Sequence, residues 1–310
     1  MIDPLDRLVG RELSRPVPAP AIALARHLAD RSPSVAAVLF YGAALRDGDM
    51  DGLLDFYVLV DSLADWHGSR WRATANRLLP PNVSYAEVAH EGRMVRAKVA
   101  VMGVDQFARA AGFAGADSTI WARFAQPAAL PYCRDEATRG RVSAAIGDAI
   151  VTAARWAALL GPLAGGPLVY WRALFANTYR AELRVEGAGR SDLIVGSAPD
   201  RYQRLLAPAW DRAGIATVEH PDGTISPLIP DVDRRAAALA WGRRVRVGKV
   251  LNILRLTKAA FTFVDGGHYL AWKIERHTGT RLALTPWQLR HPVLAGPFLL
   301  FRLWRRGVVR

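Results

Sequence analysis

The sequence has a single cysteine, Cys133, in 310 residues. One cysteine cannot form an intramolecular disulfide framework, and it fits a reducing compartment. The first residues, Met1 to Asp6, form neither a basic nor an apolar stretch, so we expect no secretory signal. We also expect no spanning helix, because the best apolar run, residues 293–303, has about half of the ~20 residues required and contains Pro297 and Arg302.

Lysine and acidic residues are scarce as well. Only four of the 41 basic residues are lysines, and the 28 acidic residues leave a net charge of +13. The arginine excess predicts an acidic partner, either a phosphate-bearing surface or a nucleic acid, although a GC-rich genome would also favour arginine and alanine. A hydrophobic content of 51% is sufficient for a sizeable core.

The N-terminal part does contain a recognisable pattern: a strand, a turn of small residues and a second strand. Residues 35–41 and 53–60 are β-branched or aromatic runs between turn residues, which predicts two buried strands. Gly42 and Ala43 follow the first run, and Asp55 lies near the start of the second. Small residues let backbone N–H groups approach phosphates, and a carboxylate can hold a divalent metal against them. The pattern is typical of a nucleotidyltransferase site.

Short motifs extend this pattern in a fixed order: Tyr41-Gly42-Ala43-Ala44, Leu54-Asp55-Phe56, Val60-Asp61, Trp66-His67, Gly92 to Arg96, Ala122 to Phe124, Tyr179 with Glu182 to Arg184, and Thr257-Lys258. In order and spacing they resemble the mitochondrial-type phosphatidate cytidylyltransferases, which make CDP-diacylglycerol from CTP and phosphatidic acid. The resemblance covers roughly three quarters of the chain. It departs where the family has serine (Ala43), lysine (Arg96 and Gln126) and aspartate (Glu182).

The resemblance implies three parts. Residues 1–131 would form an α/β nucleotidyltransferase-like domain with a mixed sheet, and residues 132–230 a mainly helical, winged-helix-like domain. Residues 231–310 would form a basic amphipathic helical C-terminus in contact with a membrane. The implied partners are CTP, phosphatidic acid and an anionic membrane surface, with Mg²⁺ or another divalent cation as cofactor. The implied location is cytoplasmic, peripheral on the inner face of the cell membrane.

The remaining elements are predicted from periodicity and turn residues. We expect helices over residues 21–30, 137–160, 169–185, 199–211 and near 269–275, and one helix after Asp61 or Ser62 that ends before Pro80. Residues 82–90 and 93–101 predict a hairpin around Glu91-Gly92. Residues 219–230 are expected to form a loop.

Asp55 is the first candidate for a metal ligand, because an ionised side chain inside an apolar run is costly unless it is paired. The alternative is a structural carboxylate that caps a turn. Polymerase-like sites have a second carboxylate two residues further, but Tyr57 occupies that position here. The second ligand must therefore come from Asp51 or Glu87, with Glu182 added by the resemblance; Asp61 is better explained as a helix cap.

The resemblance also selects phosphate ligands among the many arginines. Arg96 and Lys258 would act with Asp55 in catalysis, while Gly42, Ala43, Arg123, Glu182 and Arg184 would bind the substrates. Each cation could instead be a solvated surface charge. His67 is expected to be a packed side chain rather than a catalytic one.

The C-terminal third mixes basic with apolar and aromatic residues, both over residues 234–258 and from Trp287 to Arg310. Such mixing is typical of the interface of an anionic membrane. Two alternatives stay open. One is a nucleotidyltransferase with a non-lipid acceptor, and the other is a catalytically inactive protein that binds a nucleotide, a nucleic acid or a lipid.

Overall fold

The computed structural model describes residues 3–115, 117–181 and 189–262, together with 267, 272, 284–285 and 287–288. In chain order the elements are α1 (Pro4–Leu13), α2 (Ala19–Asp30), β1 (Val35–Tyr41), α3 (Ala43–Asp47), β2 (Leu53–Val60), α4 (Leu63–His67), α5 (Arg70–Leu78), β3 (Asn82–His90), β4 (Arg93–Gly103), α6 (Val104–Ala111), α7 (Thr119–Phe124), β5 (Ala128–Cys133), α8 (Glu136–Leu160), α9 (Pro167–Ala181), α10 (Arg190–Gly196), α11 (Pro199–Arg212), β6 (Thr217–Glu219), β7 (Ile225–Pro227) and α12 (Asp231–Thr262).

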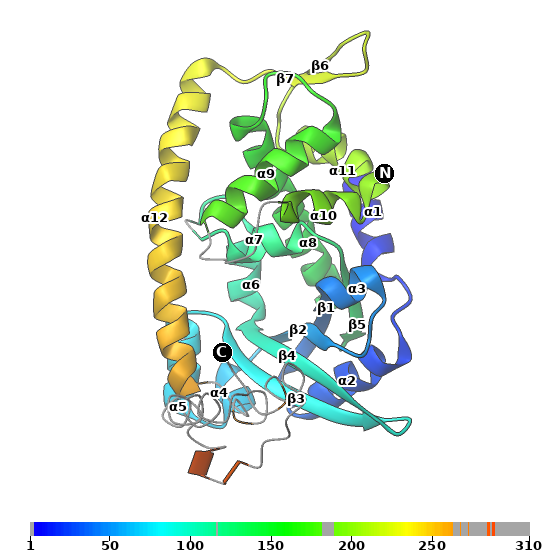
Figure 1. Cartoon of the computed structure of the whole chain (residues 1–310), viewed down its shortest axis with the longest axis vertical. Coiled ribbons are helices and arrows are strands. Elements are labelled where there is room, and N and C mark those ends of the chain that lie inside the picture. The colour runs from blue at the N-terminus through cyan, green and yellow to red at the C-terminus, as the bar shows by residue number, and fades with distance from the viewer. Residues whose placement is uncertain are drawn as a thin grey trace, which may run out of the picture.

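A five-stranded mixed sheet in the order β3-β4-β2-β1-β5 forms the lower half of the molecule in Figure 1. β2 and β4 are parallel, and the other neighbours are antiparallel. β1 and β2 have the predicted bounds, and β3 and β4 form the predicted hairpin. Glu91 and Gly92 both have positive φ angles, 49° and 75°, as a tight two-residue hairpin turn requires. The mixed α/β prediction is therefore confirmed.

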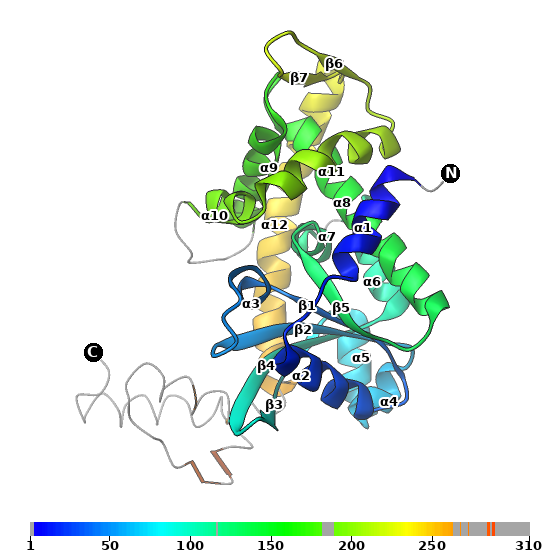
Figure 2. The same cartoon turned by 90° about the vertical axis from the view of Figure 1, so that its right-hand side faces the viewer.

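The two faces of the sheet pack against different helices. On one face, Phe40 and Phe56 stack 5.1 Å apart and belong to a core that includes the buried side of α2. On the other face, Leu39, Tyr57 and Leu59 join a larger core with α1, α6, α7 and α8 (Figure 2). The strands are therefore buried on both sides along much of their length, which explains why their sequences are nearly continuous apolar runs.

The larger core continues without a break into the helical part. α8 packs against α6, α7, α9, α11 and the N-terminal helix α1. Its residues and those of the sheet share one cluster of buried side chains, on both sides of the boundary expected at residue 131. The three-part division and the winged-helix likeness stay predictions. The plain loop expected over residues 219–230 is wrong, because β6 and β7 pair there as a short hairpin.

One helix bears on the expectation that no helix spans a membrane. Among the described residues, α8 is long and apolar enough to cross a bilayer. Two thirds of its most apolar window, 67%, is buried inside the protein. This packing is that of a core helix, which passes the same test of length and composition.

A second correction concerns the helix expected between residues 62 and 79. It is divided into α4 and α5 by Gly68, whose φ of +56° is left-handed and ends α4. Ser62 caps α4 by accepting a hydrogen bond from the Asp65 N–H at 3.2 Å. Asp61 does not cap it; its carboxylate lies 2.6 Å from Arg134.

α12 is a single helix of 32 residues that runs along the whole length of the molecule (Figure 1). It contacts α8 and α9 at one end and β3 at the other. Apart from Trp272, the helix expected near residues 269–275 lies outside the described residues, and so does the aromatic and basic cluster of residues 293–310. α12 is the continuous part of the basic C-terminal region that the structure describes.

Candidate functional site

Gly42 joins β1 to α3 and brings a carboxylate against the backbone. Its φ of +93° is a conformation that residues with a side chain rarely adopt. A Cβ atom at this position would lie only 2.8 Å from Asp55 Oδ2. Tyr41 and Asp55 are register partners on β1 and β2, so the carboxylate lies beside the turn. The juxtaposition of turn and carboxylate expected from the sequence is confirmed.

The turn itself is built from small residues. Ala43 is exposed at the first position of α3, and Ala44 behind it is buried. α3 has five residues and ends at Gly48, which has a left-handed φ of 74°. The side of the turn at Ala43 therefore presents backbone and a methyl group, without a hydroxyl.

Lys98 is a basic residue of this site that the sequence reasoning did not select. It is the register partner of Asp55 on the parallel strand β4. Register partners project from the same face of a sheet, so the Lys98 and Asp55 side chains start from neighbouring positions on that face. The signal was available: Lys98 is two residues after Arg96, a spacing that places both side chains on one face of a strand.

Arg123 reaches the same face from α7. Its Nη1 donates to the Tyr57 hydroxyl at 3.4 Å, and its guanidinium lies 5.5 Å from the ring centre of Tyr41. Tyr41 precedes the glycine turn, and Tyr57 follows Asp55 by two residues on β2. Burial raises the pKa of Tyr57, so its hydroxyl stays protonated. The predicted phosphate ligand Arg123 is thus positioned by the two tyrosines next to the turn.

Glu87 and Arg96 form a pair at some distance from Asp55. Arg96 Nε lies 3.6 Å from Glu87 Oε2, which also accepts from the Tyr85 hydroxyl at 2.8 Å. Burial, followed by the hydrogen bond to Glu87, raises the pKa of Tyr85. Glu87 is on β3, two strands away from β2, so it is ~10 Å from Asp55 across the strands. Its register partner on β4 aligns with Leu53, which adds ~7 Å between Glu87 and Asp55 along the strand direction.

Two of the candidates for a second metal ligand, Asp51 and Glu87, each lie close to an arginine. Asp51 is exposed before β2 and lies 3.5 Å from Arg93. The residues that the structure describes contain no group of three or more His, Cys, Asp or Glu side chains that could hold a metal ion. Glu182 and Arg184 lie outside the described residues. Asp51 and Glu87 as metal ligands, and Arg96 as a catalytic residue, therefore stay predictions.

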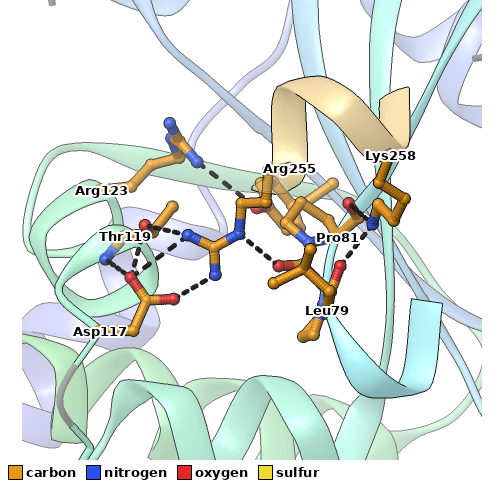
Figure 3. A network of polar contacts seen from close by, with 9 residues as sticks. Leu79, Pro81, Asp117, Thr119, Arg123, Arg255 and Lys258 are labelled. Atoms are coloured by element: carbon orange, nitrogen blue, oxygen red, sulfur yellow. Dashed lines mark hydrogen bonds and ion pairs between the residues drawn. The ribbon is translucent and has the colours of Figure 1, made fainter. Parts of the chain in front are cut away.

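Lys258 is occupied in holding α12 to the loop between α5 and β3 (Figure 3). Its ammonium donates to the carbonyl of Leu79 and, at 2.8 Å, to that of Pro81. Burial and the neighbouring Arg255 lower the pKa of Lys258 to about 8. These contacts give Lys258 a positioning role, and its predicted part in catalysis stays untested.

Arg255 fastens α12 to the start of α7, one turn from Arg123 (Figure 3). It forms an ion pair with Asp117 and donates to Thr119 Oγ1 at 3.1 Å and to the Pro80 carbonyl at 2.8 Å. Burial alone would raise the pKa of Asp117, but the hydrogen bond and charge of Arg255 outweigh it and the pKa is lowered. The ion pair thus connects α12 with the helix that carries Arg123.

His67 is a packed side chain, as expected. Its Nε2 lies 3.0 Å from Nδ2 of Asn76, a fully buried amide that also donates to the Val101 carbonyl and accepts from the Asn82 N–H, both at 3.1 Å. An amide nitrogen is a donor, so the histidine nitrogen accepts and the ring is neutral. Burial, followed by the charges of Arg72, Lys258 and Arg31, lowers the pKa of His67 to about 4.

This histidine predicts a pH dependence of stability. Since the folded pKa is below the ordinary 6.5, the unfolded chain binds more protons, and stability present above pH 6.5 is lost as the pH falls towards 4. His67→Gln keeps a hydrogen-bond acceptor but has no titrating ring. Between pH 7 and 4.5 we expect its free energy of unfolding to fall by roughly 1 kcal/mol less than that of wild type. The difference is small because the ring is only half-buried and solvent screens its charge. Urea unfolding at pH 7 and 4.5 measures this difference; equal losses would contradict the neutral ring.

No family model matches the sequence, and no curated protein does. Among solved structures, the chain is similar to a nucleotidyltransferase-like protein from Exiguobacterium sibiricum 255-15. The TM-score is 0.27 and the identity 12%, over 94% of this chain and 93% of that one. At this TM-score the similarity establishes neither the fold nor a function, so the function must be inferred from the site.

Proposed function

We propose that the protein is a nucleotidyltransferase whose triphosphate site is the Gly42 turn and Asp55. The observation that carries the proposal is the approach of the Asp55 carboxylate to a backbone position that only glycine can occupy. Glycine exposes the backbone to a phosphate chain, and the carboxylate lies where a cation on those phosphates would be. The finer proposal, from the sequence resemblance, is transfer of the cytidylyl group of CTP to phosphatidic acid with release of pyrophosphate.

A single well-placed carboxylate fits a metal that arrives with the nucleotide. Mg²⁺ in such sites is commonly held by one or two carboxylates together with substrate phosphates, and it keeps several waters. Asp55 supplies one such ligand, so a preformed cage of three protein ligands is not required. When bound, the metal would neutralise charge on the triphosphate and help to align the attacking and leaving oxygens.

The basic residues of the site would hold the phosphates themselves. Lys98 lies beside Asp55, and Arg123 is oriented by Tyr41 and Tyr57. Arginine binds phosphate oxygens through two parallel N–H groups, whereas lysine acts as a point charge. Arg123 would therefore fix the orientation of the triphosphate, and Lys98 would offset its charge.

The outer face of α12 favours a lipid acceptor. After Asp233 the helix has no acidic residue, and its solvent-facing side carries the exposed cations Arg235, Arg243, Arg246 and Lys249. The same side exposes large apolar side chains: Leu239, Val250, Ile253, Leu254, Leu256 and Phe261. Because the opposite side already packs on the core, this exposed mixture needs another partner, and an anionic membrane satisfies both its charge and its apolar area.

The competing function is nucleotide binding without catalysis. Ala43 removes a hydroxyl from the turn, and the second carboxylate of polymerase-like sites is absent from the i+2 position, which Tyr57 occupies. A protein that binds a nucleotide without transferring it would need neither group.

One assay distinguishes these functions. Purified protein is incubated with each of the four nucleoside triphosphates, Mg²⁺ and vesicles that contain phosphatidic acid, and pyrophosphate and lipid-linked nucleotide are measured. We expect both products with CTP, and none when EDTA replaces Mg²⁺. Pyrophosphate only with a soluble acceptor such as glycerol would refute the lipid acceptor, and nucleotide binding without pyrophosphate under any condition would refute the enzyme.

A substitution in the turn can add a phosphate-binding group instead of removing one. Ala43→Ser adds one hydroxyl at an exposed position with little change in volume. We expect activity equal to wild type or a few-fold higher, because the new donor can reach a phosphate oxygen. Initial rates of pyrophosphate release at saturating CTP test this. Complete inactivation of a folded Ala43→Ser protein would show that this turn is packed differently from the turn of the family that the sequence resembles.

The outer face of α12 predicts salt-sensitive membrane binding. Each basic residue near an anionic surface contributes ~1 kcal/mol, so Arg243→Gln combined with Arg246→Gln should weaken binding about thirtyfold. Flotation with phosphatidic acid vesicles at low and high salt measures this. The matched control is Arg7→Gln with Arg26→Gln, two exposed arginines on α1 and α2. Equal binding by the two double variants would show that net charge, and not this face, is responsible.

A further inference from the structure

A cavity of about 470 Å³ lies where β2 and β4 end. Val60 and Gly103, the last residues of the two strands, are register partners and both line it. It is at the other end of β2 from Asp55, five residues away, or ~17 Å along the strand. β2 and β4 are the parallel pair of this sheet, and the carboxyl ends of parallel strands are where α/β proteins commonly bind ligands.

Three arginines from three helices line this cavity: Arg77 on α5, Arg109 on α6 and Arg141 on α8. Arg141 forms an ion pair with Asp105 at 2.5 Å. Arg77 and Arg109 form no ion pair or side-chain hydrogen bond with any residue within the described part of the chain. Both side chains are exposed and line the cavity, so an anion in it would be attracted by two positive charges.

Gln106 fixes the two walls that carry these unpaired arginines. Its Oε1 accepts from the Gly103 N–H at 3.1 Å, and its Nε2 donates to the Arg77 carbonyl at 2.9 Å. The end of α5 is therefore held against the start of α6, whose next turn carries Arg109. The cavity thus has a defined shape that does not depend on a contact between the arginines.

The acidic residues at the cavity do not neutralise these two charges. Asp61 pairs at 2.6 Å with Arg134, which Asp135 shares, and Asp105 pairs with Arg141. The lining has three arginines and two aspartates, so its formal charge stays positive. A volume of about 470 Å³ is in the range of small-molecule sites, ~300–1,000 Å³, and exceeds what a single inorganic ion requires.

We propose that this cavity is a second binding site, which takes a small phosphate ester. The guanidinium groups of Arg77 and Arg109 bind the phosphate oxygens, and the rest of the molecule lies against the ends of β2 and β4. Planar guanidinium groups match phosphate oxygens in geometry as well as charge. The site does not involve Asp55 or the Gly42 turn, so it stands or falls independently of the proposed nucleotidyltransferase activity.

The test is a titration of the full chain with inorganic phosphate and, separately, with glycerol 3-phosphate. Calorimetry measures the affinity, and backbone amide NMR locates the bound ligand. We expect glycerol 3-phosphate to bind more tightly than phosphate and to shift the amides of residues 103–106, with smaller shifts at residues 42–44. The shifts should persist in Asp55→Asn. Shifts confined to residues 42–44 would overturn the proposal. Equal affinity for the two ligands would show a phosphate site without selection for an ester, which also overturns it.

Arginine variants test whether Arg77 and Arg109 bind the phosphate. We expect Arg77→Gln combined with Arg109→Gln to weaken glycerol 3-phosphate at least tenfold, while the control pair Arg7→Gln and Arg26→Gln changes it less than twofold. Both pairs remove two exposed charges, so a general effect of net charge would weaken both equally and would refute the site. The wild-type amide shifts locate the ligand even if the double variant unfolds.

Discussion

Asp55→Asn is expected to lower the rate of nucleotidyl transfer by at least ~10²-fold while the protein stays folded. Asparagine has nearly the same size, so it fits above Gly42, but it lacks the charge that would hold a cation on the triphosphate. The loss should appear mainly in kcat, because the carboxylate charge stabilises the transition state of the transfer more than the bound triphosphate. Rates of pyrophosphate release over a range of CTP and Mg²⁺ concentrations measure it.

One control variant and two test variants locate the effect. Asp47→Asn removes the same charge from an exposed position at the end of α3 and should leave the rate unchanged. Asp51→Asn and Glu87→Gln test the two candidates for a second ligand; a loss as large as that of Asp55→Asn in either would identify it. A near-normal rate in Asp55→Asn itself, with normal thermal unfolding, would show that Asp55 is a structural carboxylate.

The central strands and the glycine turn could be predicted because their physics is local. β1 and β2 are buried on both faces along most of their length, so they are nearly continuous apolar runs with turn residues at each end. β1 and β2 are antiparallel neighbours joined by the short helix α3, so the start of β2 lies beside the end of β1. This arrangement places Asp55 next to Gly42. Nothing beyond residues 35–60 is needed for this inference.

Some elements were missed, for different reasons. β5 contains Pro131 and lies at the edge of the sheet, where a missing N–H is tolerated, so its sequence does not look like a strand. α1 was missed although it has a clear start: Asp3 accepts from the Leu5 N–H at 2.7 Å, and Pro4 occupies the first turn. Those residues were considered only as evidence against a secretory signal.

Contacts between distant segments account for what the sequence could not supply at the site. Lys98 faces Asp55 only because β4 is parallel to β2 in one particular register. Arg255 and Lys258 lie more than 130 residues from their partners on α7 and the α5–β3 loop. A motif selected Lys258 as a phosphate ligand, whereas its present partners are backbone carbonyls, which the motif could not reveal.

Glu12→Gln is expected to destabilise the protein by ~3–5 kcal/mol, the scale of removing one partner of a buried ion pair. Glu12 on α1 pairs with Arg201 on α11, and their side chains are only 11% and 9% exposed. Glu12 also accepts from the Ala128 N–H at 3.2 Å, and Arg201 donates to the Ala125 carbonyl at 2.8 Å. The substitution would leave the Arg201 charge without compensation between α1, α11 and the start of β5. Urea unfolding followed by circular dichroism measures the change.

The same two helices provide an internal control. Asp6 on α1 lies 2.7 Å from Arg212 on α11, but these side chains are 48% and 26% exposed. Exposed pairs contribute ~0–1 kcal/mol, and Arg212 keeps Asp3 as a second partner at 2.6 Å, so Asp6→Asn should cost less than ~1 kcal/mol. A large difference between the two variants would show that burial, rather than the number of ion pairs, makes α1 part of the helical core. Equal small losses would mean that the Glu12 and Arg201 charges are solvated in solution.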